Sequence, residues 1–504
     1  MVASNRGNVF NFVIVLVAAL GSFTFGFSNA VVGGVFGLPS FFAYFNISLE
    51  SQSAQVNQII GAQNGLFFGG GFIGCFIVAY LPDKIGRIRN IQLTCVTCVI
   101  GSILQGAATH IAMLLVGRFL TGLGAGMVNC SIPLYQAEVS PPKQRGRMVG
   151  SHGVMLSAGF AFAGWAGYGC YYEPNHDIQW RLLLCLQVVS PAVLLTVTPW
   201  LPESPRWLVL NDKTDLAFRI LKRLHRSADD NDDTIAGEEL IQIFAQIELE
   251  KAQSRSLISM LQIPSYRRRL LTGFFIQFLC QSSGVTVINN YSVMLYTMLG
   301  IPSDVQLLIY AIWLTWSCIS NLIGSLIVDR LGRVLMFKIG FVASVVALSI
   351  YTGLMSVYSS QESKVGSGTA LAFAFLFLGC FGIFVDAVSY IYVGEIFPMF
   401  MRATGISFSI SGWFSAALVY NEVAATAFNQ IGWRYNLVFI CITVVSLPVI
   451  IFLLPETKNL PLEEVSRLFG DEVAPDADHM TAEDKERIVE SLQLVGTAIG
   501  IERL

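Results

Sequence analysis

Long apolar runs separated by short polar stretches follow one another along the chain as far as residue 454. A helix needs roughly 20 apolar residues to cross a hydrocarbon core, and these runs reach that length. They are continuously apolar and lack the alternating pattern that lipid-facing strands require. The sequence therefore predicts twelve transmembrane helices, at residues 12–36, 58–80, 91–109, 111–136, 148–170, 181–201, 271–296, 304–328, 335–357, 368–397, 404–428 and 435–454.

The longest polar stretch, residues 206–269, divides these runs six and six. Within it, residues 234–252 carry apolar side chains at helical spacing, which indicates short amphipathic helices beside the bundle. An equal division suggests two related halves, as many transporters have. We expect four parts: an N-terminal six-helix lobe (1–205), a cytoplasmic helical insert (206–269), a C-terminal six-helix lobe (270–457) and a cytoplasmic tail (458–504).

The composition is typical of a membrane protein. The 504 residues are 54% hydrophobic and only 13% charged, whereas a soluble protein needs about a quarter charged residues. The lipid bilayer is thus an expected partner. The net charge of −3 gives no indication of a nucleic-acid partner, and the oligomeric state cannot be read from the sequence.

Lysine and arginine gather in alternate loops, and this bias sets membrane orientation. One set of loops holds nearly all of them, including Lys84, Arg87, Lys143 and Arg330, while the loops around 38–57, 171–180 and 297–303 have none. Both termini are therefore expected in the cytoplasm. Asn46 begins an Asn-Ile-Ser sequon in the first outside loop, and glycosylation there and an unused sequon are equal alternatives.

Enzymatic chemistry has no support in the sequence. The ten cysteines stand almost entirely in the apolar runs, and the close pair Cys95 and Cys98 has no second pair or nearby histidines to complete a metal site. No nucleophile motif or phosphate-binding loop is present. We expect neither an enzyme nor a metal or cofactor.

Acidic and basic residues recur at matching places in the two halves. Asp83 and Arg87 follow the second helix as Asp329 and Arg333 follow the eighth. Glu138 with Arg145 follows the fourth helix, and Glu395 with Arg402 the tenth. Bidentate pairs between such groups would hold one conformation at the cytoplasmic mouth. Positive-inside bias alone explains the arginines, but it does not explain the paired acids.

Several motifs resemble those of the sugar porter family of the major facilitator superfamily, including its filamentous-fungal members. The stretches 201–208 (LPESPRWL) and 454–458 (LPETK) resemble the signatures that close the sixth and twelfth helices. Residues 117–124 (GRFLTGLG), 180–181 (WR) and 281–284 (QSSG) resemble other family motifs. The resemblance implies a two-lobed major facilitator fold that moves a sugar or polyol by alternating access. It also adds Glu203, Arg206 and Glu456 to the charged network.

The resemblance also suggests substrate-binding residues. Gln277, Gln281 and Trp413 match family positions. Thr286 stands where asparagine is usual and Tyr390 where tryptophan is usual, and His152 is followed by Gly153 in place of glutamine. Asn290 is an equal candidate for binding or for helix packing. An ordinary hexose pocket is thus in question, and an exporter of a specialised metabolite is an alternative.

Energy coupling depends on two sets of residues. In proton-driven family members an acid in the first helix works with the fourth-helix arginine; here these positions are Ser28 and Arg118, and serine cannot titrate near neutral pH. Facilitated uptake at the plasma membrane is the first expectation. Asp386 and Glu422 lie within membrane runs, where acids are usually functional, so a proton symporter is an alternative, as is a neutral structural role for both. A non-transporting sugar sensor is a further alternative.

Overall fold

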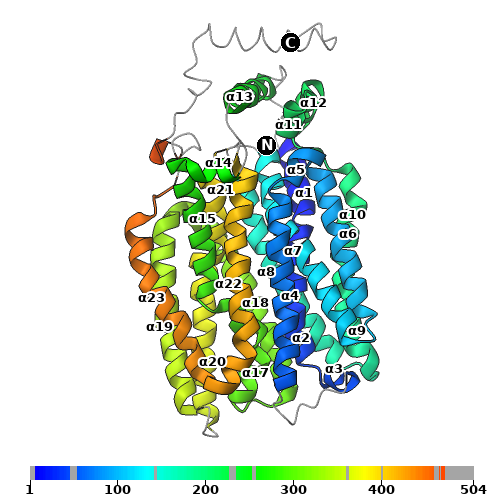
Figure 1. Cartoon of the computed structure of the whole chain (residues 1–504), viewed down its shortest axis with the longest axis vertical. Helices are drawn as coiled ribbons and strands as arrows, with labels where there is room; N and C mark the ends of the chain where they lie inside the picture. Colours follow the sequence, from blue (N-terminus) through cyan, green and yellow to red (C-terminus); the bar gives the residue numbers. More distant parts are fainter. Residues whose placement is uncertain are drawn as a thin grey trace.

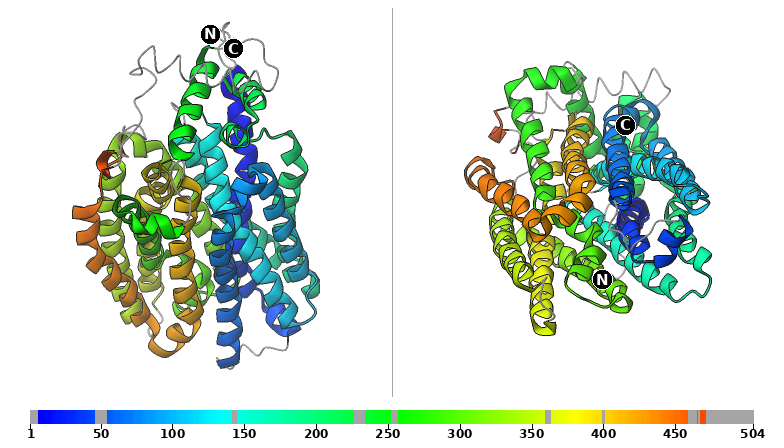
Figure 2. Two further views of the ribbon diagram at one scale, coloured as in Figure 1. Left: turned by 45° about the horizontal axis from the view of Figure 1, so that its top comes forward. Right: turned by 60° about the horizontal axis from the view of Figure 1, so that its bottom comes forward.

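The computed structural model describes residues 6–45, 54–140, 145–225, 234–251, 257–358, 363–398, 401–458, 465 and 467–470. These residues form helices and short connections, and no strand occurs among them. Two groups of roughly parallel helices stand side by side (Figures 1 and 2). Helices up to α10 make one group, which we call the N lobe, and helices α15 to α23 make the other, the C lobe.

In the N lobe the chain runs along the bundle axis six times. Long apolar helices make most of these passes, and shorter helices bend the first and sixth. Its elements are α1 (Arg6–Ala18), α2 (Leu20–Phe36), α3 (Pro39–Tyr44), α4 (Ala54–Val78), α5 (Leu81–Ile85), α6 (Arg87–Gly106), α7 (Ile111–Val139), α8 (Arg145–Tyr171), α9 (His176–Cys185), η3 (Leu186–Val188), α10 (Val189–Val197) and η4 (Thr198–Trp200).

The C lobe repeats this plan. Its elements are α15 (Pro264–Ser282), α16 (Val285–Asn290), α17 (Ser292–Met298), α18 (Ser303–Leu331), α19 (Arg333–Tyr358), α20 (Lys364–Phe381), η5 (Gly382–Asp386), α21 (Ala387–Ile396), α22 (Arg402–Ile431), η7 (Gly432–Arg434) and α23 (Tyr435–Leu453).

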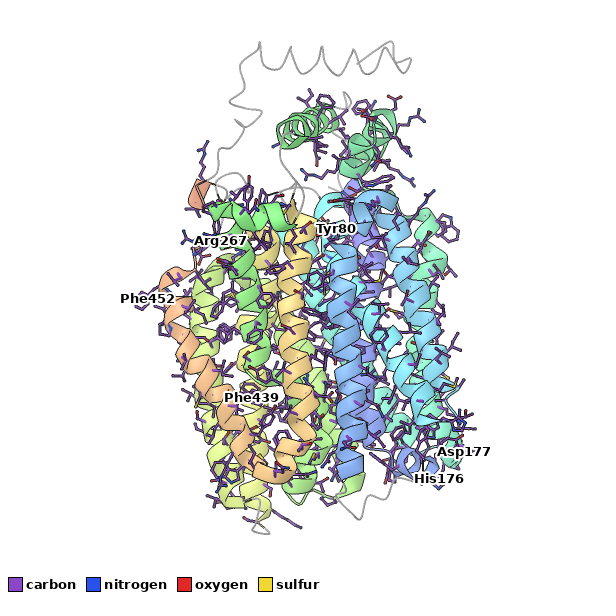
Figure 3. All side chains as sticks on the ribbon, viewed as in Figure 1. Tyr80, His176, Asp177, Arg267, Phe439 and Phe452 are labelled. Atoms are coloured by element: carbon purple, nitrogen blue, oxygen red, sulfur yellow. The ribbon has the colours of Figure 1, made fainter. Side chains whose placement is uncertain are left out.

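Twelve passes are confirmed. In the described part of the chain nine helical stretches are apolar and long enough to cross a membrane, and one of these, Arg402–Leu453, contains both α22 and α23. The more polar α6 and α8, with 20 and 27 residues, complete the set. The outward faces are apolar, as lipid requires: Phe452 on α23 is 80% exposed and points away from the bundle (Figure 3).

Besides the first and sixth, two further passes expected as unbroken helices are interrupted. The seventh pass stops at Ser282 and restarts at Val285, because Gly284 takes the left-handed conformation with φ +85°. The tenth pass contains the π-helical segment η5, whose wider turn carries Asp386. Such segments are frequent at functional sites.

The insert forms α11 (Pro205–Leu210), α12 (Thr214–His225), α13 (Thr234–Lys251) and α14 (Leu257–Gln262) at one end of the bundle, which we call the insert end (Figure 1). The expected amphipathic helix is present, with Leu240, Ile243 and Ile247 buried against α11 and α12. The amide of Asn11 on α1 donates a 2.8 Å hydrogen bond to the carbonyl of Leu224 on α12. The insert is thereby attached to the N lobe.

The lobes meet along two seams, α4 against α22 and α8 against α18. Small residues allow this approach. A methyl group at Gly61 of α4 would lie 2.7 Å from the backbone oxygen of Glu422 on α22, closer than a Cβ normally approaches, so a side chain there would push the two helices apart.

Candidate functional site

A compact charged cluster lies at the insert end of the N lobe. The Nε and Nη2 of Arg87 donate to both oxygens of Glu138 at 2.9 and 2.8 Å, and Nη1 donates to Asp83 at 2.9 Å. Arg87 and Glu138 side chains are each 6% exposed. We call Asp83, Arg87, Glu138 and Glu203 the N-lobe cluster.

The C lobe repeats the arrangement as the C-lobe cluster of Asp329, Arg333, Glu395 and Glu456. Arg333 donates to both oxygens of Glu395, at 3.1 Å from Nε and 2.7 Å from Nη2, and to Asp329 at 3.0 Å. This cluster is more open, since the side chain of Glu395 is 23% exposed. The paired acids and arginines predicted from the sequence are thus brought together in both lobes.

Glu203 and Glu456 accept hydrogen bonds from backbone N–H groups at the start of α6 and α19. Glu203 accepts from the N–H groups of Arg87 and Ile88 at 3.0 and 3.3 Å. Glu456 accepts from Arg333 and Val334 at 2.9 and 3.0 Å. Each carboxylate thus caps the N-terminus of a helix, where the free N–H groups and the helix dipole favour an anion.

Burial and charge act in opposite directions in the N-lobe cluster. Burial alone would lower the pKa of the Arg87 guanidinium, but Glu138 and Asp83 raise that pKa above its ordinary value. Burial raises the pKa of the Glu203 carboxyl, against the backbone N–H groups that lower it. Arg87 therefore keeps its positive charge beside these acids.

The other predicted network residues lie less centrally. Arg206 on α11 acts electrostatically on Glu138. Arg402 is buried and donates from Nη2 to the carbonyl of Phe397 at 3.3 Å. Arg145 begins α8, and its side chain lies outside the described part of the structure, as does the whole of Asn46.

Deep in the C lobe, Gln277 on α15 is fully buried, and neither its amide nitrogen nor its oxygen has a hydrogen-bond partner in the structure. One turn further, Gln281 accepts a hydrogen bond from the hydroxyl of Thr286 across the break at Gly284. An unpaired buried amide costs about 1–3 kcal/mol, so Gln277 is poised for a ligand that can supply both partners.

Further along the same pass, Asn290 donates to Asn421 on α22 at 3.1 Å. Tyr291 donates to the carbonyl of Asn421 at 2.7 Å and accepts from Asn64 on α4 at 3.3 Å. This network therefore ties the half of the seventh pass beyond Gly284 to the N lobe.

A second network crosses between the lobes at His152 on α8. Its Nδ1 lies 2.7 Å from the hydroxyl of Ser22, and its Nε2 lies 3.0 Å from the amide oxygen of Asn129. Asn129 also donates to the hydroxyl of Tyr390 on α21 at 3.4 Å, and the His152 and Tyr390 rings are in edge contact at 4.9 Å. The chain thus uses Tyr390 as a polar link between α21 and the N lobe.

Trp413 packs against aromatic rings rather than beside these amides. It lies in edge contact with Phe25 and Phe68 of the N lobe, with ring centroids 5.5 and 5.9 Å apart. At 4% exposure it closes the seam between the lobes.

The predicted coupling residues are dispersed. Arg118 donates to the backbone carbonyl of Ser28 at 2.9 Å and lies over the Phe67 ring, and it has no acidic partner among the described residues. Asp386 on η5 accepts from Asn321 of α18 at 3.0 Å. Glu422 is exposed on the α4–α22 seam.

Sequence reasoning missed Asn64, Asn129, Asn321 and Asn421, which link helices throughout this region. Each is an isolated asparagine in an apolar run and is fully buried. That pattern is a usable signal for interhelical contact, although it does not identify the partner.

Comparison with known proteins agrees with this architecture. The sequence model of the family described as "Sugar (and other) transporter" matches residues 14–469. The MFS-type transporter criB of Aspergillus cristatus is 32% identical over 90% of this chain and 92% of its own length. The sugar transporter STL1 of Saccharomyces cerevisiae is 26% identical over 92% of this chain and 82% of its own.

Among solved structures, the proton:xylose symporter XylE of the major facilitator superfamily superposes with a TM-score of 0.79. It is 21% identical, and the match covers 92% of this chain and all of XylE. The fold is therefore that of the major facilitator superfamily, and the chain belongs to its sugar transporter family.

Proposed function

We propose that this protein carries a sugar or polyol into the cell by alternating access. The observation that supports this proposal most directly is Gln277, whose buried amide nitrogen and oxygen have no hydrogen-bond partner among the described residues. Gln281, Thr286, Asn290, His152, Tyr390 and Trp413 complete the proposed substrate region. Relatives named as a sugar transporter and a high-affinity glucose transporter support this substrate class.

The two charged clusters supply the conformational element. Each links helix ends of one lobe at the insert end through a buried arginine. When they are intact the lobe ends are held rigid, and their rearrangement would accompany opening toward that side. We assign the insert end to the cytoplasm because lysine and arginine concentrate there. With this orientation we propose that both chain termini are cytoplasmic, as suits a plasma-membrane carrier.

Facilitated diffusion is the proposed mode. Arg118, which would face an acid in a proton-driven carrier, instead bonds to the backbone carbonyl of Ser28. A hydroxyl at Ser28 cannot carry a proton near neutral pH. A proton symporter is the second candidate, and the carboxylate of Asp386 between α18 and α21 favours it.

Binding is tested by replacing the glutamines. In a host lacking its own sugar carriers, Gln277→Ala and Gln281→Ala should each raise the half-saturation concentration by about tenfold, the equivalent of a loss of ~1.4 kcal/mol. Surface expression, measured on the same cells, is the control. Unchanged half-saturation in both variants would move the substrate site elsewhere and favour the exporter alternative.

Coupling is tested with a protonophore. Facilitated uptake should stop at equal concentrations on the two sides, and its initial rate should be unaffected when the proton gradient is collapsed. Accumulation that the protonophore abolishes would instead establish symport, with Asp386 and then Glu422 as candidate carriers.

A further inference from the structure

An acceptor-rich patch lies on the α8–α18 seam, beside the proposed substrate region. It is made by Asn321 of α18 and Asp386 of η5, which are joined by the 3.0 Å hydrogen bond from the amide nitrogen to the carboxylate. Asn321 is fully buried, and its other N–H donates to the carbonyl of Ser317 at 3.1 Å. Both donors of Asn321 are therefore used.

The oxygen of Asn321 is left without a partner. Its Oδ1 is buried and accepts no hydrogen bond from any described residue. It faces α8 at Gly153, where an added methyl group would lie 3.9 Å from it and 3.5 Å from the Cβ of Ala387. Because Gly153 has no side chain, nothing from that residue covers this oxygen. A ligand that enters the seam when the lobes separate would therefore reach the free oxygen of Asn321.

When ionised, Asp386 adds a negative charge, and among the described residues no lysine or arginine forms an ion pair with it. Asn321 provides the hydrogen bond to the Asp386 side chain, and the titratable neighbours that interact with Asp386 in the described structure are Cys280 and Tyr390. Neither of these can be positively charged. On the N-lobe side, His152 contacts Tyr390 and has both ring nitrogens engaged by Ser22 and Asn129.

These features together specify the chemistry of a ligand. Unfilled acceptors require a donor, which a hydroxyl or an ammonium group can provide. A carboxylate without a positively charged partner is unfavourable in the membrane interior. A hydroxyl ligand is neutral and would not balance that charge. A protonated amine satisfies both the free acceptors and the charge.

We propose that Asp386 and Asn321 form a subsite for a protonated amine, so that the preferred substrate is a polyhydroxylated compound with a positively charged amino group. This inference rests on the proposed transport function and narrows its substrate class. The hydroxyls would meet Gln277 and Gln281 of α15, while the amine would lie between Gly153 and the Asp386–Asn321 pair.

The test uses two matched pairs of probes, glucosamine with glucose and N-methylglucamine with sorbitol. In each pair the first compound is cationic below neutral pH and the second is neutral. Dissociation constants are measured on the purified full chain at pH 6 by ligand-dependent thermal unfolding. In at least one pair the cation should bind at least about tenfold more tightly, or ~1.4 kcal/mol.

Variants then locate the preference. Asp386→Asn, which keeps the shape of the side chain, should bring the ratio within the discriminating pair to about one, with the neutral probe affected less than the cation. Gly153→Gln places an amide against Asn321 and should weaken the cationic probe selectively, which provides a second route if Asp386→Asn does not fold. Asp177→Asn removes an exposed carboxylate at the far end of the bundle (Figure 3) and should leave the ratio unchanged.

Each other outcome contradicts the inference. Equal binding within both pairs, or a preference that survives both Asp386→Asn and Gly153→Gln, overturns the amine subsite while leaving sugar transport intact. Neutral-sugar uptake that requires a proton gradient and loses that requirement in Asp386→Asn assigns the carboxylate to a proton instead. Binding of none of the four probes, together with unaffected glutamine variants, would remove the proposed function as well.

Discussion

In the N-lobe cluster all three guanidinium nitrogens of Arg87 donate hydrogen bonds, two to Glu138 and one to Asp83 and the carbonyl of Pro82. In the C-lobe cluster the Nη1 of Arg333 is buried and has no hydrogen-bond partner in the described part of the chain. The acids differ in the same direction: Glu138 is 6% exposed and Glu395 23%. Two copies of one motif have thus become a tight cluster and a looser one, which suggests that the C-lobe cluster rearranges more easily.

The largest effect should come from removing the arginines. Arg87→Ala leaves Glu138 buried and unpaired, which costs about 3–5 kcal/mol in the state that contains the cluster. Arg333→Ala should cost roughly 1–2 kcal/mol, because Glu395 and Asp329 can reach water. Uptake per surface-expressed transporter and the unfolding temperature should both fall further for Arg87→Ala.

The lysine variants serve as matched controls for this pair. A lysine keeps the charge but cannot bind a carboxylate through two parallel hydrogen bonds. Arg87→Lys should therefore recover only part of the loss. If the two alanine variants were equally impaired, the difference in burial would have no functional meaning.

A smaller effect is expected at Glu203 and Glu456, and here the C-lobe residue should matter more than the N-lobe residue. Glu456 accepts from four backbone N–H groups, those of Arg333, Val334, Thr457 and Lys458. Glu203 accepts from three, those of Arg87, Ile88 and Ser204.

Glu456→Gln should accordingly destabilise more than Glu203→Gln, within the range of about 0.5–2 kcal/mol typical of helix caps. The unfolding temperatures of the two variants provide the measurement. The reverse order would show that burial, rather than the number of donors, determines the strength of the cap.

The smallest effect should come from a pair of tyrosines. Tyr135 donates to the carbonyl of Pro202 at 2.7 Å, and Tyr392 donates to that of Pro455 at 3.1 Å. Replacing either by phenylalanine removes one neutral hydrogen bond, worth about 0.5–1.5 kcal/mol. Tyr135→Phe should lower the unfolding temperature slightly more, and a larger fall in Tyr392→Phe would contradict the ranking.

The sequence predicts the twelve passes because they depend on local hydrophobic spacing, and it predicts the arginine–acid pairs because the same residues recur in both halves. Asp329 and Arg333, for example, lie only four residues apart, on either side of the turn at Gly332 that joins α18 to α19. The break at Gly284 is harder to foresee, since many membrane helices contain glycine without breaking. The partners of Asn321 and Asn129 cannot be read at all, because each lies in another helix whose rotation is fixed only by packing.

The hydrogen bond from Asn11 to the carbonyl of Leu224 bears on how the protein is made. Asn11 is 1% exposed, and its partner follows 213 residues later. This hydrogen bond can therefore form only after five further passes and α12 have been synthesised. The insert thus completes the contacts of the N lobe although it follows that lobe in the sequence. A truncation before α12 should yield a half-protein whose first helix lacks this hydrogen bond.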